Sequence, residues 1–311
     1  MTTSDYRSKV ELLIRIIPAI SEEVDLAIHG GTAINLFVKD LPRYSVDIDL
    51  TYIPILDRKA SIENINACLG RIADRLRQSV KGIQTALRPD ICKLLCSFKG
   101  SQVKVEVNQT KRGIVSGEPQ LMPLCNKAQE DFGMYCEARV VPISLLYGGK
   151  ISAALSRQHP RDLFDVRHMD HSLLEVKEGI LYCLLSSDRP ISEPLSPNLI
   201  DQSSVMESQF AGMTKTPFTY QDYEATRDKL IRDIQTLFSE SEREFLISFA
   251  CGSPKWSLIP YPSFESHPSI AWKLLNIRTL RDNDPGSFSK QISKLRGILT
   301  YRSKWWVGIA L

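Results

Sequence analysis

Asp47 and Asp49 are the acidic residues best placed for chemistry, because they alternate with apolar residues between Val46 and Leu50. Residues two apart on a β-strand share one face, so both carboxylates should point the same way while the apolar side chains enter the core. Two carboxylates on one face repel each other unless a cation lies between them, and Mg²⁺ (or Mn²⁺) with a substrate phosphate supplies that charge. A solvated edge strand shows the same alternation, so the pair alone leaves both interpretations open.

A glycine pair precedes these acids: Gly30 and Gly31 are followed by Thr32 and by an expected helix over residues 33–38. Glycine permits a tight turn and a close approach to a ligand, and the free N–H groups at a helix start bind phosphate. Gly-Gly pairs also occur in ordinary turns. At this distance from the acids, however, the combination indicates a site for a nucleotide and a metal ion.

A third carboxylate, Glu106, lies in a segment of alternating residues from Val103 to Asn108. The valines take one face of the expected strand over 102–108, and the charged residues take the other. The charged face is either exposed to solvent or, if this strand lies beside the Asp47–Asp49 strand, part of the metal site. The alternation alone leaves both interpretations open; in the second, Glu106 would be a third metal ligand, a role that the resemblance described below favours.

Five charged residues lie on the polar side of the segment 144–170, namely Lys150, Arg157, Arg161, Asp162 and Asp165. A solvated helix with an Arg161–Asp165 pair would give the same pattern. On one continuous helix, Lys150 and Asp165 would be about 22 Å apart at roughly 1.5 Å per residue, too far to share a site. Proline breaks a helix interior but suits a first turn. We therefore expect one helix over 144–157, a second from Pro160, and Asp165 turned back toward the nucleotide.

The remaining periodicity predicts the elements that would position these residues. Amphipathic helices are expected over 5–20 and 57–81, with strands over 26–28, 46–52, 91–98 and 102–108. Residues 119–131 and 138–142 indicate further strand and loop. A polar stretch with prolines, 186–204, is either a linker or an ordered loop, and helices are expected over 218–238 and within 245–277. The length of 311 residues suits two domains, 1–175 and a mainly helical 176–311.

The composition is that of an ordinary globular protein, with 43% hydrophobic and 24% charged residues. The net charge of +3 demands no polyanionic partner, so nucleic-acid binding would depend on a local basic patch. Seven cysteines without metal-type spacing indicate reduced thiols, and five scattered histidines give no zinc motif. We see neither a signal peptide nor an apolar run long enough to cross a membrane, and expect a cytoplasmic protein.

Tryptophans mark the C-terminal region. Trp256 and Trp272 are expected to anchor packing rather than to contact a ligand. The segment 289–306 is basic and ends in Trp305 and Trp306. Basic residues interleaved with aromatic ones suit RNA, and a solvated helix with a tryptophan docking face fits equally well.

The order of these motifs resembles the AbiEii/AbiGii toxin family, the toxin half of type IV toxin–antitoxin and abortive-infection systems. That family lies in the nucleotidyltransferase superfamily with a polymerase-β-like palm. It carries Gly-Gly-(Ser/Thr) and then Arg-x-Ser-x-Asp-x-Asp, here Arg43, Ser45, Asp47 and Asp49. Its Lys…Arg…Arg-Asp-x-x-Asp motif matches the residues from Lys150 to Asp165, and two C-terminal motifs match 252–256 and 267–276. The resemblance covers nearly the whole chain.

The resemblance implies an α+β fold, a mixed sheet flanked by helices, with a mainly helical C-terminal domain. It implies transfer of NMP from an NTP to the 3′ end of tRNA by a two-metal mechanism, which would block translation. Asp47, Asp49 and Glu106 would hold the metal ions, and the β- and γ-phosphates would be bound by Gly30, Gly31, Thr32 and Ser45. Lys150, with Arg157 or Arg161, would counter the phosphate charge. Asp165 would orient Lys150, the base or the ribose.

The resemblance also implies an AbiEi-type antitoxin as a partner. The acceptor stays open: a related transferase could modify a protein or a small molecule such as an antibiotic. A nucleotide-binding module without turnover is a further alternative, against which the intact Asp-x-Asp argues. A phosphodiesterase would typically need His–Asp metal ligands, which the sequence does not show. Replacing Asp47 or Lys150 with Ala is expected to abolish transfer and to leave folding nearly intact.

Overall fold

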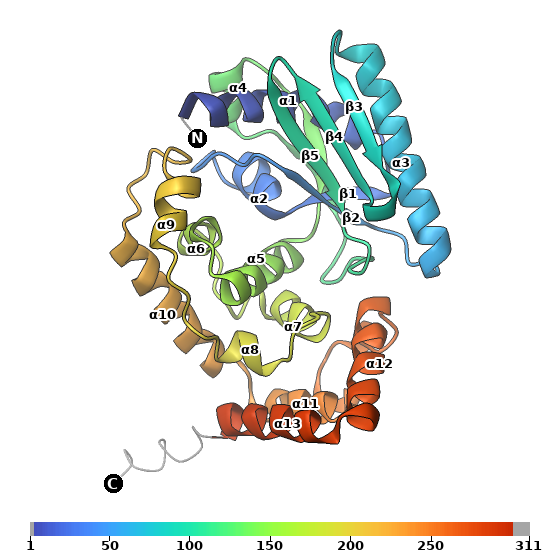
Figure 1. The fold of residues 1–311 in the computed structure, drawn as a ribbon, viewed down its shortest axis with the longest axis vertical. Coiled ribbons are helices and arrows are strands. Elements are labelled where there is room, and N and C mark those ends of the chain that lie inside the picture. Colours follow the sequence, from blue (N-terminus) through green and yellow to red (C-terminus); the bar gives the residue numbers. More distant parts are fainter. Residues whose placement is uncertain (1–2, 301–311) are drawn as a thin grey trace.

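The centre of the molecule is a mixed seven-stranded sheet in a computed structural model that describes residues 3–300 (Figure 1). The strands lie in the order β3-β4-β5-β2-β1-β7-β6. Their bounds are Leu26–His29 (β1), Ile48–Tyr52 (β2), Gln84–Arg88 (β3), Lys93–Phe98 (β4), Ser101–Val107 (β5), Gln120–Pro123 (β6) and Glu137–Val140 (β7). Strand β2 pairs antiparallel with β1 and parallel with β5. The strands that carry Asp49 and Glu106 are therefore neighbours, as predicted.

The register of the central strands sets which side chains meet. Asp49 lies opposite Glu106 on β5 and opposite His29 on β1. Residues paired in this way project from the same face of a sheet. On β5 the valines are buried and Lys104 and Glu106 are exposed, so one face of the sheet is core and the other is charged.

Two long helices, α1 (Thr3–Ser21) and α3 (Arg58–Ser79), pack beside each other against the sheet. Asp57 is the N-cap of α3, the residue directly before the helix. Its carboxylate accepts a hydrogen bond from the backbone N–H of Ala60 at 3.0 Å, which stabilises the start of the helix. A short helix α2 (Gly30–Ala33) continues as a π-helix, η1 (Ile34–Val38). Helix α4 (Asn126–Phe132) follows β6.

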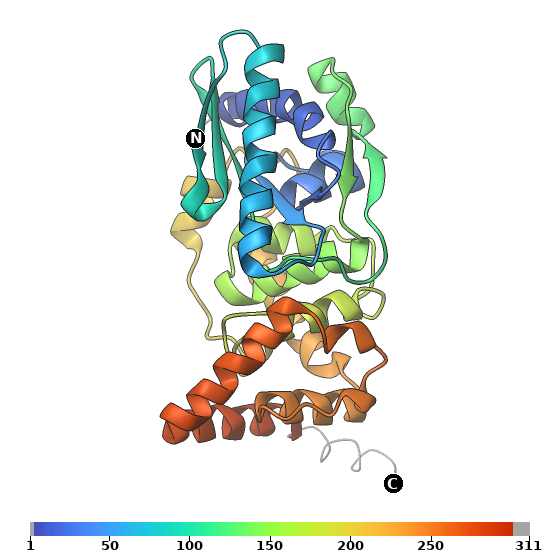
Figure 2. The same cartoon turned by 90° about the vertical axis from the view of Figure 1, so that its right-hand side faces the viewer.

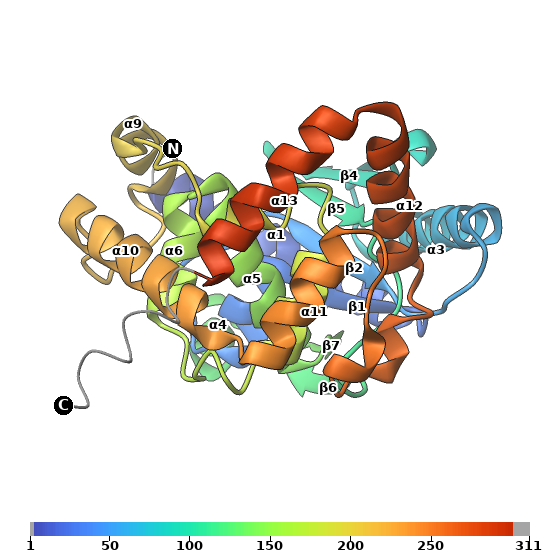
Figure 3. The ribbon, with the colours of Figure 1, turned by 90° about the horizontal axis from the view of Figure 1, so that it is seen from below.

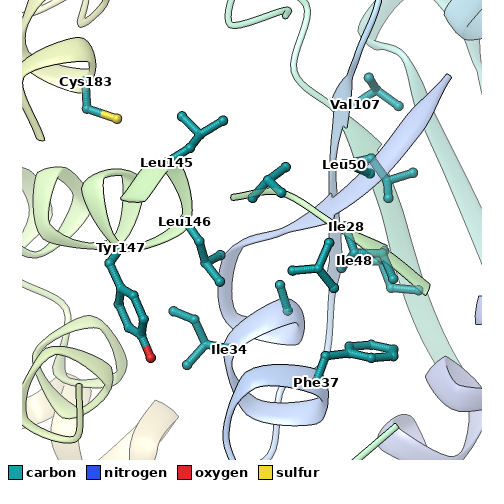
Figure 4. Close-up of a cluster of buried hydrophobic side chains, with 14 of the residues drawn as sticks. Ile28, Ile34, Phe37, Ile48, Leu50, Val107, Leu145, Leu146, Tyr147 and Cys183 are labelled. Carbon is teal, nitrogen blue, oxygen red and sulfur yellow. The ribbon is translucent and has the colours of Figure 1, made fainter. Parts of the chain in front are cut away.

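Helices α5 (Ile143–Arg157) and α6 (Pro160–Arg167) confirm the predicted break at Pro160. Gln158 ends α5 in the left-handed region, with φ of 50°. The side chain of His159 then caps α6 by accepting a hydrogen bond from the backbone N–H of Arg161 at 3.2 Å. Figure 4 shows that Leu145 and Leu146 of α5 lie in one buried cluster with side chains of the central strands and of η1.

Helix α7 (Lys177–Leu185) packs closely on α5 because two glycines face the contact. A Cβ atom on Gly148 would lie 2.2 Å from the backbone of Gly179, and one on Gly179 would lie 1.9 Å from the carbonyl oxygen of Ser144. Backbone therefore meets backbone here. Any larger residue would push the two helices apart.

The remaining elements of the described residues are all helices or 3₁₀ turns. They are α8 (Ser192–Leu195), α9 (Ser203–Val205), the π-helix η3 (Met206–Phe210), α10 (Tyr220–Leu237), α11 (Glu240–Ala250), α12 (Pro268–Asn283) and α13 (Pro285–Thr300), with short 3₁₀ turns at Pro89–Ile91, Trp256–Leu258 and Pro262–Phe264. Figures 2 and 3 show α11, α12 and α13 gathered at the end of the molecule farthest from the sheet. Among the described helices, none is long and apolar enough to cross a bilayer.

The mixed α+β fold and most predicted elements are confirmed, with three differences. Strand β3 was not predicted, and the segment 119–131 contains helix α4 in addition to strand β6. The stretch 186–204, predicted as either a linker or an ordered loop, is an ordered excursion that includes α8, in agreement with the second alternative. The prediction that Trp272 anchors packing is wrong, because this residue is 55% exposed, whereas Trp256 packs on Phe245 with ring centroids 5.3 Å apart. The part of the basic tail beyond residue 300 lies outside the described residues, and the division at residue 175 stays a prediction.

Candidate active site

A cavity of about 440 Å³ opens between the charged face of the sheet and helix α5. Most of the residues singled out in the sequence line it: Gly30, Gly31, Ser45, Asp47, Asp49, Glu106, Lys150, Arg157 and Arg161. Thr32 and Asp165 are buried beside the cavity and do not line it. The fold thus brings the glycine turn, the acids and the basic helix together at one place.

The acids occupy one wall. Asp49 projects from the centre of β2 beside Glu106, and Asp47 comes just before the same strand. Gly30 adopts a φ of +67°, and a Cβ atom there would lie 2.5 Å from Oδ2 of Asp49. Glycine is therefore required at position 30 both for its backbone conformation and for the space that the Asp49 carboxylate takes.

Three lysines influence the charges along this wall. The pKa of Asp49 is raised above its ordinary value. Limited hydration is the main cause, and the negative charges of Asp47 and Glu106 add to it, whereas Lys150 acts in the opposite direction. Nζ of Lys93 lies 2.9 Å from Oε2 of Glu106, and Nζ of Lys104 lies 3.5 Å from Oδ2 of Asp47. Two of the three carboxylates are thus held by ammonium groups.

The fit of this wall to a metal ion can be judged from those contacts. Within residues 3–300, no three His, Cys, Asp or Glu side chains are grouped closely enough to hold a metal by themselves. Mg²⁺, however, usually binds through one or two carboxylates and takes its other oxygens from waters and substrate phosphates. Asp49 fits that pattern, and so does Asp47, because its contact with Lys104 is looser, at 3.5 Å, than the 2.9 Å contact between Lys93 and Glu106. Glu106 fits it only after Lys93 releases its carboxylate, so its role as a third ligand stays a prediction.

The glycine turn is held against the acid-bearing segment. A Cβ atom on Gly31 would lie 2.8 Å from the guanidinium of Arg43 and 3.0 Å from Oγ of Ser45. The Thr32 hydroxyl is 1% exposed and donates to the carbonyl oxygen of Asp47 at 2.5 Å. Thr32 therefore positions Asp47 in this structure, which differs from the expected hydrogen bond between its hydroxyl and a phosphate.

A buried ion network forms the opposite wall. Arg43 donates twice to Asp165, from Nε at 2.7 Å and from a terminal nitrogen at 2.5 Å. Nζ of Lys150 lies 2.9 Å from Asp165 and 3.1 Å from Asp162. Arg157 donates to both oxygens of Asp162, at 2.6 and 2.9 Å. Asp165 therefore holds Lys150, the first of the three roles expected for it.

The charges in this network do not cancel. Burial by itself would raise the pKa of Asp165, but Arg43 and Lys150 outweigh it and hold that pKa below its ordinary value. Lys150 and Arg157 likewise lower the pKa of Asp162 against the effect of burial. Both acids are therefore charged at neutral pH. Three cations share two carboxylates, so the network has a surplus positive charge, and all three cations, Lys150 among them, line the cavity.

The C-terminal half of the chain also reaches this cavity. Tyr182 and Cys183 of α7 line it, as does Met213 from the loop between η3 and α10. The carbonyl oxygen of Met213 accepts a hydrogen bond from the backbone N–H of Tyr44 at 2.7 Å. The segment that carries Arg43 and Ser45 is thus paired with a segment about 170 residues later.

Sequence reasoning missed several residues of the site. Arg43 and Asp162 were part of recognised motifs, but their burial in one network was not foreseen. His29 lines the cavity beside Asp49, and its pKa is lowered to about 4 by burial and by the charges of Lys111 and Lys150, so its ring is neutral at pH 7. Its position directly before Gly30 was the one available signal. Lys93 and Lys104 became visible only through the strand register.

Comparison with known proteins identifies the family of this chain. No match was found among curated proteins. Among solved structures, the fold is similar to MenT4, a nucleotidyltransferase toxin from Mycobacterium tuberculosis, with a TM-score of 0.57 and 14% sequence identity over 88% of this chain and 93% of that one. Residues 11–266 match the family described as nucleotidyl transferase AbiEii toxin of type IV toxin–antitoxin systems. This chain therefore belongs to the AbiEii family of nucleotidyltransferase toxins.

Proposed function

We propose that this protein transfers NMP from an NTP to the 3′ end of tRNA in the cytoplasm and so inhibits translation and growth. The family supplies the class of reaction and an NTP as substrate. The resemblance supports tRNA as the acceptor, and the observation that supports binding of an NTP with a metal ion is the pairing of two opposed walls in one cavity. Carboxylates on β2 and β5 face Lys150 and Arg157 on α5. An NTP with its metal ion carries both signs of charge and would satisfy both walls.

The acidic wall is the proposed metal side. Asp47 and Asp49 would hold a divalent cation, Mg²⁺ or Mn²⁺. Glu106 would become a third ligand after its ion pair with Lys93 breaks. Such a cation would neutralise phosphate charge and favour ionisation of the acceptor hydroxyl. The hydroxyl would lose its proton to water, its oxygen would bond to the α-phosphorus, and pyrophosphate would leave with the electron pair of the broken P–O bond.

The basic wall is the proposed phosphate side. Lys150 is one of the three cations of the buried network, and Arg157 and Arg161 lie on the same side of the cavity. Gly30 and Gly31 would offer backbone N–H groups at the start of α2, and Ser45 a hydroxyl. Asp165 does not touch the cavity. Its proposed part is to hold Lys150 in place for the β- and γ-phosphates.

The test is incubation with each radiolabelled NTP, Mg²⁺ and total tRNA, beside an Asp49→Asn variant. Label on the RNA that is lost in the variant supports the proposal. Label on protein, or on an added small molecule, would replace tRNA with another acceptor. Binding of NTP with no label on any acceptor would show that the protein binds nucleotide without transferring NMP, which contradicts the proposal. An AbiEi-type antitoxin is the proposed partner, and growth rescue by its co-expression tests that part separately.

A further inference from the structure

His29 lies between the acidic wall and the basic wall of the cavity. It ends β1 and is the register partner of Asp49 on β2, so its ring projects from the same face as the Asp49 carboxylate. Together with Glu106 on β5 and Lys93 on β4, these residues form one row across four neighbouring strands. His29 is the member of this row nearest to α5.

The imidazole of His29 contacts both structures that flank the cavity. Nδ1 lies 3.0 Å from the hydroxyl of Thr51, a buried residue of β2 two positions after Asp49. The ring also hydrogen-bonds to the backbone of Leu145 in the first turn of α5. One side chain thus connects the strand that carries Asp49 to the helix that carries Lys150.

The fit of the ring against α5 depends on a glycine. A Cβ atom on Gly149 would lie 2.8 Å from Nε2 of His29, tighter than atoms of this kind approach each other. Gly149 directly precedes Lys150 in the helix. The imidazole therefore packs on the helix backbone at the point from which the Lys150 side chain starts.

We propose that His29 is a positioning residue that sets the separation between Asp49 and Lys150, and so the affinity for NTP. The proposal rests on the proposed function, since it assumes that Lys150 binds the phosphates. His29 acts through α5, so it needs no contact with the reacting atoms. A rigid link is useful here because the two walls carry opposite charges and attract each other across the cavity.

The experiment measures NTP affinity directly, with each radiolabelled NTP in Ca²⁺ to suppress turnover, and transfer rates in Mg²⁺. His29→Ala should weaken NTP binding and lower kcat about three- to tenfold, the effect of a lost hydrogen bond. His29→Gln places an amide near the position of Nε2 and should restore most of both. His29→Asn reaches only the Thr51 side and should not. His168→Ala is the matched control, because His168 is half-buried, hydrogen-bonded to the carbonyl oxygen of Phe164, and outside the cavity.

A second variant separates this idea from simple loss of folding. Gly149→Ala should weaken NTP binding as His29→Ala does, and adding it to His29→Ala should cost little more, because the ring it displaces is already gone. Equal NTP affinity and kcat in wild type and His29→Ala would overturn the inference. So would full additivity of the two substitutions.

The failure of the proposed function gives a different result. Lys150→Met should weaken NTP binding, and His29→Ala should then have no further effect in that background. If Lys150→Met binds NTP as wild type does, the phosphate role of Lys150 fails. If Lys150→Met is defective and His29→Ala is not, only the positioning role of His29 fails.

Discussion

Replacing Asp165 with Asn should destabilise this protein more than replacing Lys150 with Met, although both residues belong to one network. Arg43 is 2% exposed and Asp165 has no exposed side-chain surface. Asp165→Asn leaves the Arg43 guanidinium buried without its carboxylate and leaves three cations sharing Asp162. Breaking a buried ion pair from one side costs about 3–5 kcal/mol. The low end applies, since the Asn oxygen can still accept one hydrogen bond from Arg43.

Lys150→Met has a smaller expected cost. Asp165 keeps both hydrogen bonds from Arg43, and Asp162 keeps both from Arg157, so each carboxylate retains a guanidinium. The substitution removes the surplus charge, and we expect a loss of about 1–2 kcal/mol. This revises the expectation from sequence that folding stays nearly intact without Lys150, because the lysine is 5% exposed and hydrogen-bonded inside the network.

The assay is urea unfolding followed by circular dichroism, for both variants and wild type, at pH 7 and near pH 3.5. The Asp165 carboxylate stabilises the fold when it is charged, and this contribution falls away as the pH drops through its lowered pKa. The deficit of Asp165→Asn relative to wild type should therefore shrink at acid pH. A Lys150→Met variant less stable than Asp165→Asn at pH 7 would refute the charge count on which this reasoning depends.

Gly30→Ala should reduce transfer about 10²-fold, because the added Cβ displaces the Asp49 carboxylate; transfer at the wild-type rate would contradict that geometry. Gly179→Ala should destabilise the protein by more than about 2 kcal/mol in urea, since the Cβ would meet the Ser144 carbonyl, while Gly297→Ala, with open space around it, should not. Lys93→Met should free Glu106 and lower the Mg²⁺ concentration for half-maximal transfer several-fold. The control Lys99→Met should leave the Mg²⁺ requirement unchanged. If Lys93→Met also leaves it unchanged, Glu106 is not a metal ligand.

The neighbouring positions of the acids were predictable because strand periodicity and motif spacing are local properties. Alternation placed Asp47, Asp49 and Glu106 on polar faces, and Pro160 predicted the helix break that lets Asp165 reach Lys150. Long-range pairing was not predictable in the same way. The lysine that holds Glu106 comes from β4, and the sequence gives no sign that Lys93 and Glu106 share a register until the sheet is known.

Burial was the second property that sequence reasoning could not supply. Sequence spacing predicts an i,i+4 pair between Arg161 and Asp165. In the structure Asp165 is instead buried and accepts hydrogen bonds from Arg43, a residue 122 positions earlier. His29 looked like one of five scattered histidines and proved to contact both walls of the cavity. Trp272 looked like a packing anchor because tryptophan usually is one, but its face of α12 is exposed. In each case the tertiary environment, rather than local pattern, decided the outcome.

The opposed charges across this cavity require that packing hold its two walls apart. An acidic strand and a basic helix that face each other would be drawn together if either could move, and the space for a nucleotide would be lost. Strand β2 is held in the sheet by its pairing with β1 and β5. Helix α5 is held by its close glycine contact with α7. Tyr182 and Cys183 of α7 and Met213 line the cavity as well, so residues on both sides of the predicted division at residue 175 shape this site. An NTP and its cation would then bind as one neutralising unit, the phosphates toward Lys150 and the cation toward Asp49, and each should raise the affinity for the other.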